Sequence, residues 1–222
     1  MSIAKHIQEL HNSLPSEVTL VAVSKFHPVE ALREAYNAGQ RVFGESRAQE
    51  LVAKQQQLPT DIEWHFIGPL QRNKVKDIVP FIRLIHSVDS AALLLEIEKQ
   101  AAKCERIVDV LLEIHVAEEE TKHGLTPAEC RQLLADEAVR SLPHIRICGL
   151  MSMATNTDDE AQIRQEFHQV KMLFDELKNG LCKENPNFTQ LSMGMSHDYP
   201  LAIAEGSNLV RVGTYIFGER EY

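Results

Sequence analysis

The segment Leu20-Val21-Ala22-Val23-Ser24-Lys25 is an apolar run that ends on a cation. A short apolar run bounded in this way predicts a strand that is buried on both faces of a parallel sheet. Pro28 stands where a first helical turn begins, and Gly39 follows the next helical segment as its C-terminal cap. A buried strand followed at once by a capped helix is one unit of an α/β fold.

The same unit recurs along the rest of the chain. Eight strands are predicted, at 19–24, 41–43, 64–67, 82–86, 107–114, 145–150, 189–192 and 208–212. Helices are predicted at 28–38, 46–57, 72–79, 90–103, 126–138, 160–178 and 198–204, with an additional N-terminal helix at 2–12. A capping box from Thr126 to Glu129 marks the start of the helix at 126–138. Eight right-handed strand–helix units predict an α/β fold, a single (β/α)8 TIM barrel, and a doubly wound open sheet is the alternative. Because no linker interrupts the pattern, residues 1–222 are expected to form one domain without room for a second.

Composition narrows the classes of function. The net charge of −9 disfavours a nucleic-acid binder with a broad phosphate-contacting face. No window approaches the roughly 18 apolar residues that a membrane span needs, and no signal-peptide pattern is present. The four cysteines form no Cys-x-x-Cys pair, which favours free thiols over a zinc site. A cytoplasmic protein is therefore expected.

Polar and glycine residues gather where the predicted strands end. The carboxyl ends of the strands form the active-site face of such a barrel. The residues there are Ser24-Lys25, Gly44-Glu45-Ser46-Arg47, His65 with Gly68, His86-Ser87, His115, Met151-Ser152-Met153, Ser192-Met193-Gly194-Met195-Ser196, and Arg211 with Gly213-Thr214.

Lys25 and the last two loops predict a phosphate site joined to a reactive amine. A lysine at the end of a core strand can be desolvated and become a nucleophile, as pyridoxal phosphate (PLP) requires for its Schiff base. The alternative is a Lys25 side chain that extends to solvent. The loops Ser192–Ser196 and Gly213-Thr214 have the small and hydroxyl residues of a phosphate cradle, and a helix predicted near His197 would point its positive end there.

Arg211 is expected to face a pyridine nitrogen. Because arginine keeps its proton, it would donate a hydrogen bond and leave that nitrogen unprotonated, which weakens the ring as an electron sink. The alternative is an ion pair between Arg211 and Glu205 or Glu45.

Eight segments follow one another along the chain: Val21–Lys25, Phe43–Glu45, Trp64–Gly68, Leu70-Gln71 with Asn73-Lys74, His86–Asp89, Gly149–Met151, Leu191–Ser196 and Val210–Thr214. In this order they resemble one family, the pyridoxal phosphate homeostasis proteins of the YggS/PROSC type. The resemblance implies a barrel like that of alanine racemase, with PLP as a Schiff base on Lys25, phosphate contacts from Ser192–Ser196 and Gly213-Thr214, and Arg211 near the pyridine nitrogen. It also implies a role in intracellular vitamin B6 and amino-acid homeostasis without established turnover. Apo PLP-dependent enzymes are expected as acceptors of the cofactor, and the protein is expected to be a monomer. The cofactor residues that it implies are Lys25, Ser46, His65, Ser192, Met193, Gly194, Ser196, Arg211, Gly213 and Thr214.

The sequence departs from the family pattern after the second strand. Where Gly-Glu-Asn-Tyr is usual, this chain has Gly44-Glu45-Ser46-Arg47. Because Ser46 is shorter than asparagine, we expect a weaker contact with the cofactor ring and retained phosphate binding. Arg47 adds positive charge at the mouth. Arg72, Lys74 and Lys76 make either a basic rim or the solvated face of a helix.

Other functions remain as alternatives. A PLP-dependent amino-acid racemase would use Lys25 as base and a residue such as His65 as its partner. A third alternative is a barrel that binds another phosphorylated metabolite. A metal at His65, His86 and His115 is disfavoured because the chain lacks metal-ligand spacing. The acidic run at 118–120 is predicted to be a solvated loop.

Overall fold

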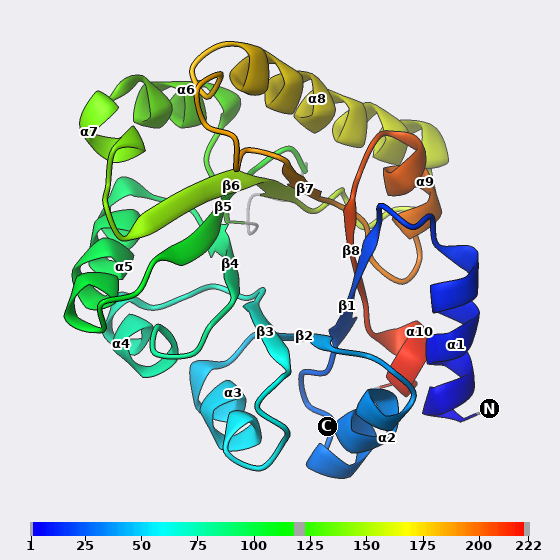
Figure 1. Ribbon diagram of the computed structural model, residues 1–222. Helices are drawn as coiled ribbons and strands as arrows, with labels where there is room; N and C mark the ends of the chain where they lie inside the picture. Colours follow the sequence, from blue (N-terminus) through cyan, green and yellow to red (C-terminus); the bar gives the residue numbers. More distant parts are fainter. Residues whose placement is uncertain (1, 118–122, 220–222) are drawn as a thin grey trace.

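The computed structural model describes residues 2–117 and 123–219, and these form a closed barrel. The parallel strands follow one another around the ring in chain order, and β8 pairs with β1, so the open-sheet alternative is wrong (Figure 1). The (β/α)8 prediction is confirmed. The strands are β1 Thr19–Val23, β2 Val42–Glu45, β3 Glu63–Phe66, β4 Leu84–Val88, β5 Val108–Ile114, β6 Ile145–Ser152, β7 Gln190–Ser192 and β8 Leu209–Val212.

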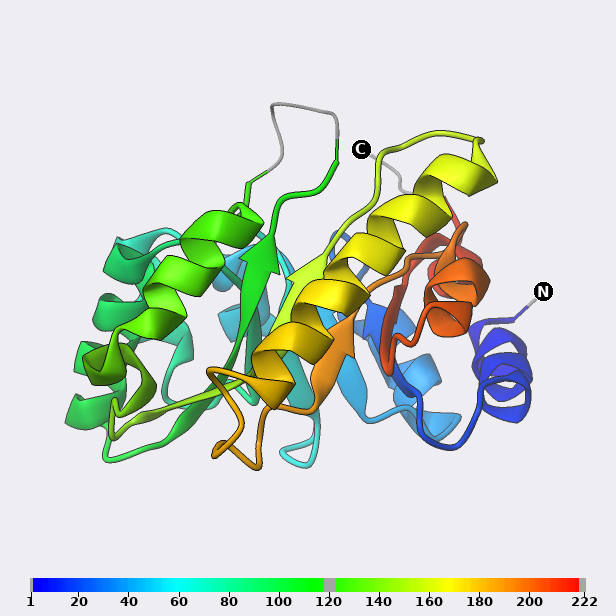
Figure 2. The ribbon, with the colours of Figure 1, turned by 90° about the horizontal axis from the view of Figure 1, so that it is seen from above.

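Helices surround the barrel, as Figures 1 and 2 show. The long helix α8 crosses the outside of the sheet, and its residues Ile163, Phe167, Val170 and Phe174 are buried as the spacing predicts. The helices are α1 Ile3–Ser13, α2 Val29–Asn37, α3 Ala48–Gln55, α4 Val75–Ile78, α5 Ala91–Lys103, α6 Pro127–Ala135, α7 Glu137–Arg140, α8 Glu160–Asn179, α9 Tyr199–Ala204 and α10 Thr214–Phe217, with a 3-10 turn at Arg72–Lys74.

Two helical predictions needed correction, and one short helix was not predicted. The helix predicted at 72–79 is a 3-10 turn followed by the single turn α4. The helix predicted at 126–138 breaks at Asp136, which leaves helical geometry and caps α7 through a bond from the Ala138 N–H. The capping box at Thr126 and Glu129 is confirmed. The short α10, which packs beside α1 near the end of the chain, was missed.

The junction between β7 and β8 closes with few sheet contacts. Its register has one residue pair, Ser192 with Leu209. The Asn208 amide adds two bonds, accepting from the Leu191 N–H at 2.8 Å and donating to the Thr189 carbonyl at 2.8 Å. The Ser207 hydroxyl lies within hydrogen-bond distance of the carbonyls of Leu191 and Met193. Side-chain amides and hydroxyls therefore supplement a short β-ladder where the barrel closes.

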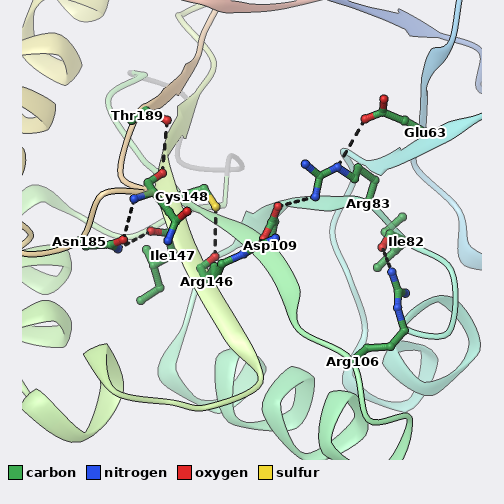
Figure 3. A network of polar contacts seen from close by, with 11 residues as sticks. Glu63, Ile82, Arg83, Arg106, Asp109, Arg146, Ile147, Cys148, Asn185 and Thr189 are labelled. Carbon is green, nitrogen blue, oxygen red and sulfur yellow. Dashed lines mark hydrogen bonds and ion pairs between the residues drawn. The ribbon is translucent and has the colours of Figure 1, made fainter.

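The amino ends of β3 to β6 carry a charged network (Figure 3). Asp109 of β5 is buried and accepts from Arg83 at 2.7 Å and from Arg146 at 2.5 Å. Arg83 also reaches Glu63 at 3.4 Å. The strands also form a separate buried apolar cluster, made by Val21, Leu84, Leu111, Cys148, Met151 and Leu209.

The described helices include none with the length and apolarity that crossing a bilayer requires. All four cysteines are free thiols as predicted, and Cys148 is buried in β6.

Candidate functional site

A pocket of about 240 Å³ opens at the carboxyl ends of β1 and β8. Five of the predicted cofactor residues line it: Lys25, Ser196, Arg211, Gly213 and Thr214. Lys25 is half-buried in the turn that follows β1, and its side chain lines the pocket. The remaining lining is formed by Val23, Ile67, Met153, Met195 and His197.

The loops after β7 and β8 are joined at the pocket wall. The Gly213 N–H donates to the Ser196 hydroxyl at 3.1 Å, and the Arg211 N–H donates to the Gly194 carbonyl at 3.0 Å. Gly194 has a φ of +92°, and a Cβ there would lie 2.7 Å from the Ala202 side chain. Glycine is therefore required for the loop to pack this closely on α9.

The Arg211 guanidinium is buried and held by neutral acceptors. It donates to the Ser192 carbonyl at 2.9 Å, to the Ser192 hydroxyl at 2.5 Å and to the Ser152 carbonyl at 2.8 Å. Burial lowers the pKa of Arg211 to about 10, and the charges of Asp198 and Glu113 oppose that shift. The group stays cationic at neutral pH.

The ion pair of Arg211 with Glu205 or Glu45 is wrong because both carboxylates are engaged elsewhere. Glu205 lies 3.2 Å from His168, and Glu45 lies 2.7 Å from Lys54.

A hydrogen-bonded chain of buried side chains runs from Arg211 across the barrel. The Ser192 hydroxyl lies 3.1 Å from His86 Nδ1, and His86 Nε2 lies 2.9 Å from His65 Nδ1. Burial lowers the pKa of His65 to about 3 and that of His86 well below its usual range, so both rings are neutral. His65 and Ser192 thus lie behind Arg211 and support it from within the barrel.

The three histidines considered as metal ligands have different surroundings. His65 and His86 are buried and bonded to each other, whereas His115 is half-buried at the end of β5. Among the described residues, no group of three or more His, Cys, Asp or Glu side chains is placed to hold a metal ion.

Ser46 lines a neighbouring pocket of about 260 Å³. Arg47 and Lys74 line the same pocket, and the Arg47 guanidinium also lies 4.6 Å from the centre of the Phe26 ring. Arg72 and Lys76 of the predicted basic rim are exposed and lie outside this lining.

The predicted site residues therefore fall into three groups, one around Lys25, one beneath Arg211, and Ser46 beside them. Met193 is buried in the core behind the β7 loop. The acidic run at 118–120 lies outside the described residues.

Comparison with known proteins assigns this barrel to a family. The model of the alanine racemase N-terminal domain matches residues 1–221. The pyridoxal phosphate homeostasis protein of Aquifex aeolicus is 43% identical over 204 residues, covering 91% of this chain and 87% of the relative. That of Escherichia coli is 39% identical over 212 residues, covering 94% and 88%. The chain belongs to the pyridoxal phosphate homeostasis protein family.

Solved structures agree with that assignment. PipY of Synechococcus elongatus, solved without PLP, superposes with a TM-score of 0.90 at 41% identity, covering 98% of this chain and all of PipY. PipY with PLP bound superposes with a TM-score of 0.88 at 40% identity, with the same coverage. Alanine racemase of Clostridium difficile, at 15% identity and a TM-score of 0.79, shares the barrel fold over 57% of its chain.

Sequence reasoning missed a charged cluster in this homeostasis-family barrel. Lys54 of α3 is only 5% exposed, and its ammonium lies 2.7 Å from Glu45, 2.7 Å from Glu50 and 2.8 Å from the Ser24 carbonyl. Burial raises the pKa of Glu45 to about 7, although Lys54 opposes the shift. The spacing of four residues between Glu50 and Lys54 could have indicated this cluster, but such pairs are common on solvated helices.

Proposed function

We propose that this protein binds pyridoxal 5'-phosphate, holds it as a Schiff base on Lys25, and serves intracellular PLP and amino-acid homeostasis. The observation that carries the proposal is the convergence of Lys25, Arg211 and the two joined loops on one pocket. The structure of PipY with PLP bound, at 40% identity over nearly the whole chain, supports the choice of ligand.

The chemistry of the pocket fits this cofactor. Its lining among the described residues combines one lysine, one arginine and two hydroxyls without a carboxylate, which suits an anionic aldehyde. The hydroxyls of Ser196 and Thr214 and the loop from Ser192 to Ser196, with Gly213, would hold the phosphate. Ser46 would contact the ring from its neighbouring pocket.

Arg211 supports a role in holding PLP. When bound, PLP supplies an electron sink whose strength depends on a protonated pyridine nitrogen. Arg211 would donate to that nitrogen, and its three neutral acceptors keep the guanidinium in place. Because Arg211 keeps its own proton, it disfavours protonation of the pyridine nitrogen. We therefore propose a reversible carrier for apo PLP-dependent enzymes, acting as a monomer in the cytoplasm.

The racemase alternative with His65 as the partner acid finds little support. His65 is buried, lies outside the pocket lining, and has a pKa of about 3 because of burial. A neutral ring bonded to His86 lacks the acidic imidazolium proton that a general acid would deliver to a substrate at neutral pH.

One spectrum tests cofactor, linkage and residue together. Protein loaded with PLP should show a visible absorption band that borohydride abolishes, and peptide mass mapping should place the reduced adduct on Lys25. The other lysines of the chain serve as internal controls. An adduct on another lysine, or no band, would contradict the proposal, and the second result would favour a different phosphorylated metabolite. Rapid exchange of amino-acid α-protons in deuterated water, lost in Lys25→Ala, would instead support a racemase.

A further inference from the structure

One face of α3 reaches back to the turn that carries Lys25. Arg47 caps the helix, and Glu50 and Lys54 follow at intervals of three and four residues, which places all three on the same side. Leu51 and Ala48 of the same helix are buried in the core, so apolar packing already attaches α3 to the barrel. The charged residues on this face of α3 therefore have a role other than attaching the helix to the barrel.

Two of its contacts hold backbone atoms on either side of Lys25. The Lys54 ammonium donates to the Ser24 carbonyl at 2.8 Å, and the Phe26 N–H donates to Glu50 Oε1 at 2.7 Å. The third contact is the Arg47 guanidinium over the Phe26 ring, at 4.6 Å. Side chains of α3 thus form hydrogen bonds with the backbone of the residues before and after Lys25.

The backbone at this turn has an unusual conformation. Phe26 has a φ of +69°, in the left-handed region that bulky residues rarely adopt. Such a conformation persists where surrounding contacts determine it. The bond from the Phe26 N–H to Glu50 and the stacked Arg47 are contacts of that kind.

Lys54 joins three elements through one ammonium group. Besides the Ser24 carbonyl it contacts Glu45 of β2 and Glu50 of its own helix, and the Ser24 hydroxyl donates to Glu45 at 2.6 Å. A buried ion pair contributes little net stability compared with apolar packing, because desolvation offsets the attraction. Its directional bonds do, however, fix the positions of the groups they join.

We propose that Glu50 and Lys54 are positioning residues that fix the backbone at Lys25 and thereby set how its amine enters the pocket. The inference rests on the proposed function, since it concerns the linkage of PLP to Lys25. It predicts that loosening this turn impairs the linkage and spares the phosphate cradle, which is built from the loops after β7 and β8.

The test compares two ligands that differ in one group. PLP can form the linkage, whereas 4'-deoxypyridoxine 5'-phosphate lacks the aldehyde and measures the pocket alone. Glu50→Ala removes the acceptor for Phe26 and leaves Lys54 paired with Glu45. Loss of a hydrogen bond to a charged group should weaken PLP binding by about tenfold. Affinity for the deoxy analogue should stay within about twofold, and Glu50→Gln, which keeps an acceptor oxygen, should restore PLP binding.

The controls separate positioning from general loosening. Glu137→Ala, on the exposed first turn of α7, makes the same charge change and should alter neither affinity. Equal losses for both ligands in Glu50→Ala, or no loss for either, would overturn the inference. If Glu50→Ala does not fold, Glu50→Asp keeps the charge, shortens the reach and carries the same comparison. Failure of the wild-type protein to link PLP to Lys25 would instead refute the proposed function.

Discussion

Glu113 carries a buried carboxyl near the carboxyl end of β5. Burial raises its pKa to about 7, the Asp89 charge adds to that shift, and Arg211 opposes it. A carboxyl whose folded pKa lies above its unfolded value contributes stability below the unfolded pKa, and this contribution is lost as pH rises through the folded value. The stability of the protein should therefore fall as pH rises from about 4.5 to about 7. Above about pH 7 Glu113 is ionised, and the loss of stability should be complete.

Replacing this carboxyl should stabilise the protein at alkaline pH. Glu113→Gln removes the ionisation, so we expect its free energy of unfolding at pH 8 to exceed the wild-type value by about 1–3 kcal/mol. At pH 5 the two proteins should differ much less, because the native carboxyl is then protonated. Urea unfolding at both pH values measures the difference, and the exposed Glu137→Gln is the control. A gain of equal size at both pH values would contradict the assigned ionisation.

The four thiols should differ sharply in reactivity. Burial raises the pKa of Cys130 and Cys148 to about 12 and that of Cys182 to about 11, while Cys104 is exposed. Because the thiolate is the reactive form, a disulfide reagent at pH 8 should label one thiol quickly in the native protein and all four in urea. Cys104→Ser should abolish the fast phase, and a fast phase that survives this change would show that a buried thiol opens to solvent.

Among the elements, β6 depends on a single glycine. Gly149 has a φ of +151°, and a Cβ there would lie 1.7 Å from the Gln190 carbonyl of β7. The register between β5 and β6 shifts beside it, so the bulge and the close approach of β7 occur together. No side chain fits without separating the strands.

Gly149→Ala should accordingly unfold the protein or destabilise it by more than about 3 kcal/mol, which is in the range of strained-backbone and overpacking costs. Gly39→Ala is the matched control, since Gly39 also has a positive φ, of +103°, but nothing lies within 4 Å of a Cβ there. It should lose only about 1 kcal/mol. Thermal unfolding of both variants gives the comparison, and similar losses would mean that the contact with Gln190 relaxes easily.

Element prediction from the sequence worked where local signals are strong. The eight strands were found because each is an apolar run bounded by polar or glycine residues, and α6 was placed by the capping box at Thr126. The break at Asp136 and the single turn α10 were missed. Asp136 can either continue a helix or cap one, and four residues are too few to show a periodic pattern.

For the whole molecule, chain order around a closed barrel explains which site residues the sequence could predict. Lys25 and Arg211 stand at ends of β1 and β8, and these strands are neighbours only because the ring closes. A barrel prediction therefore brings them together without knowledge of side-chain positions. The contacts of His65 with His86, and of Lys54 with the Ser24 carbonyl, depend on which way side chains turn inside the packed barrel, and no local pattern encodes that.

Ligand binding should be visible in the stability of the whole barrel. A ligand that binds only the folded state at 100 times its Kd stabilises by about 2.7 kcal/mol. For a chain of this size that corresponds to a rise in Tm of about 5–10 °C. PLP should produce this rise in the wild-type protein, and after borohydride reduction the rise should persist through dialysis, because the ligand is then covalently joined to Lys25. In Lys25→Ala we expect a smaller rise that dialysis abolishes, since Arg211 and the loops after β7 and β8 would still bind the free ligand. A wild-type rise that dialysis removed after reduction would show that PLP stabilises the barrel without forming the linkage.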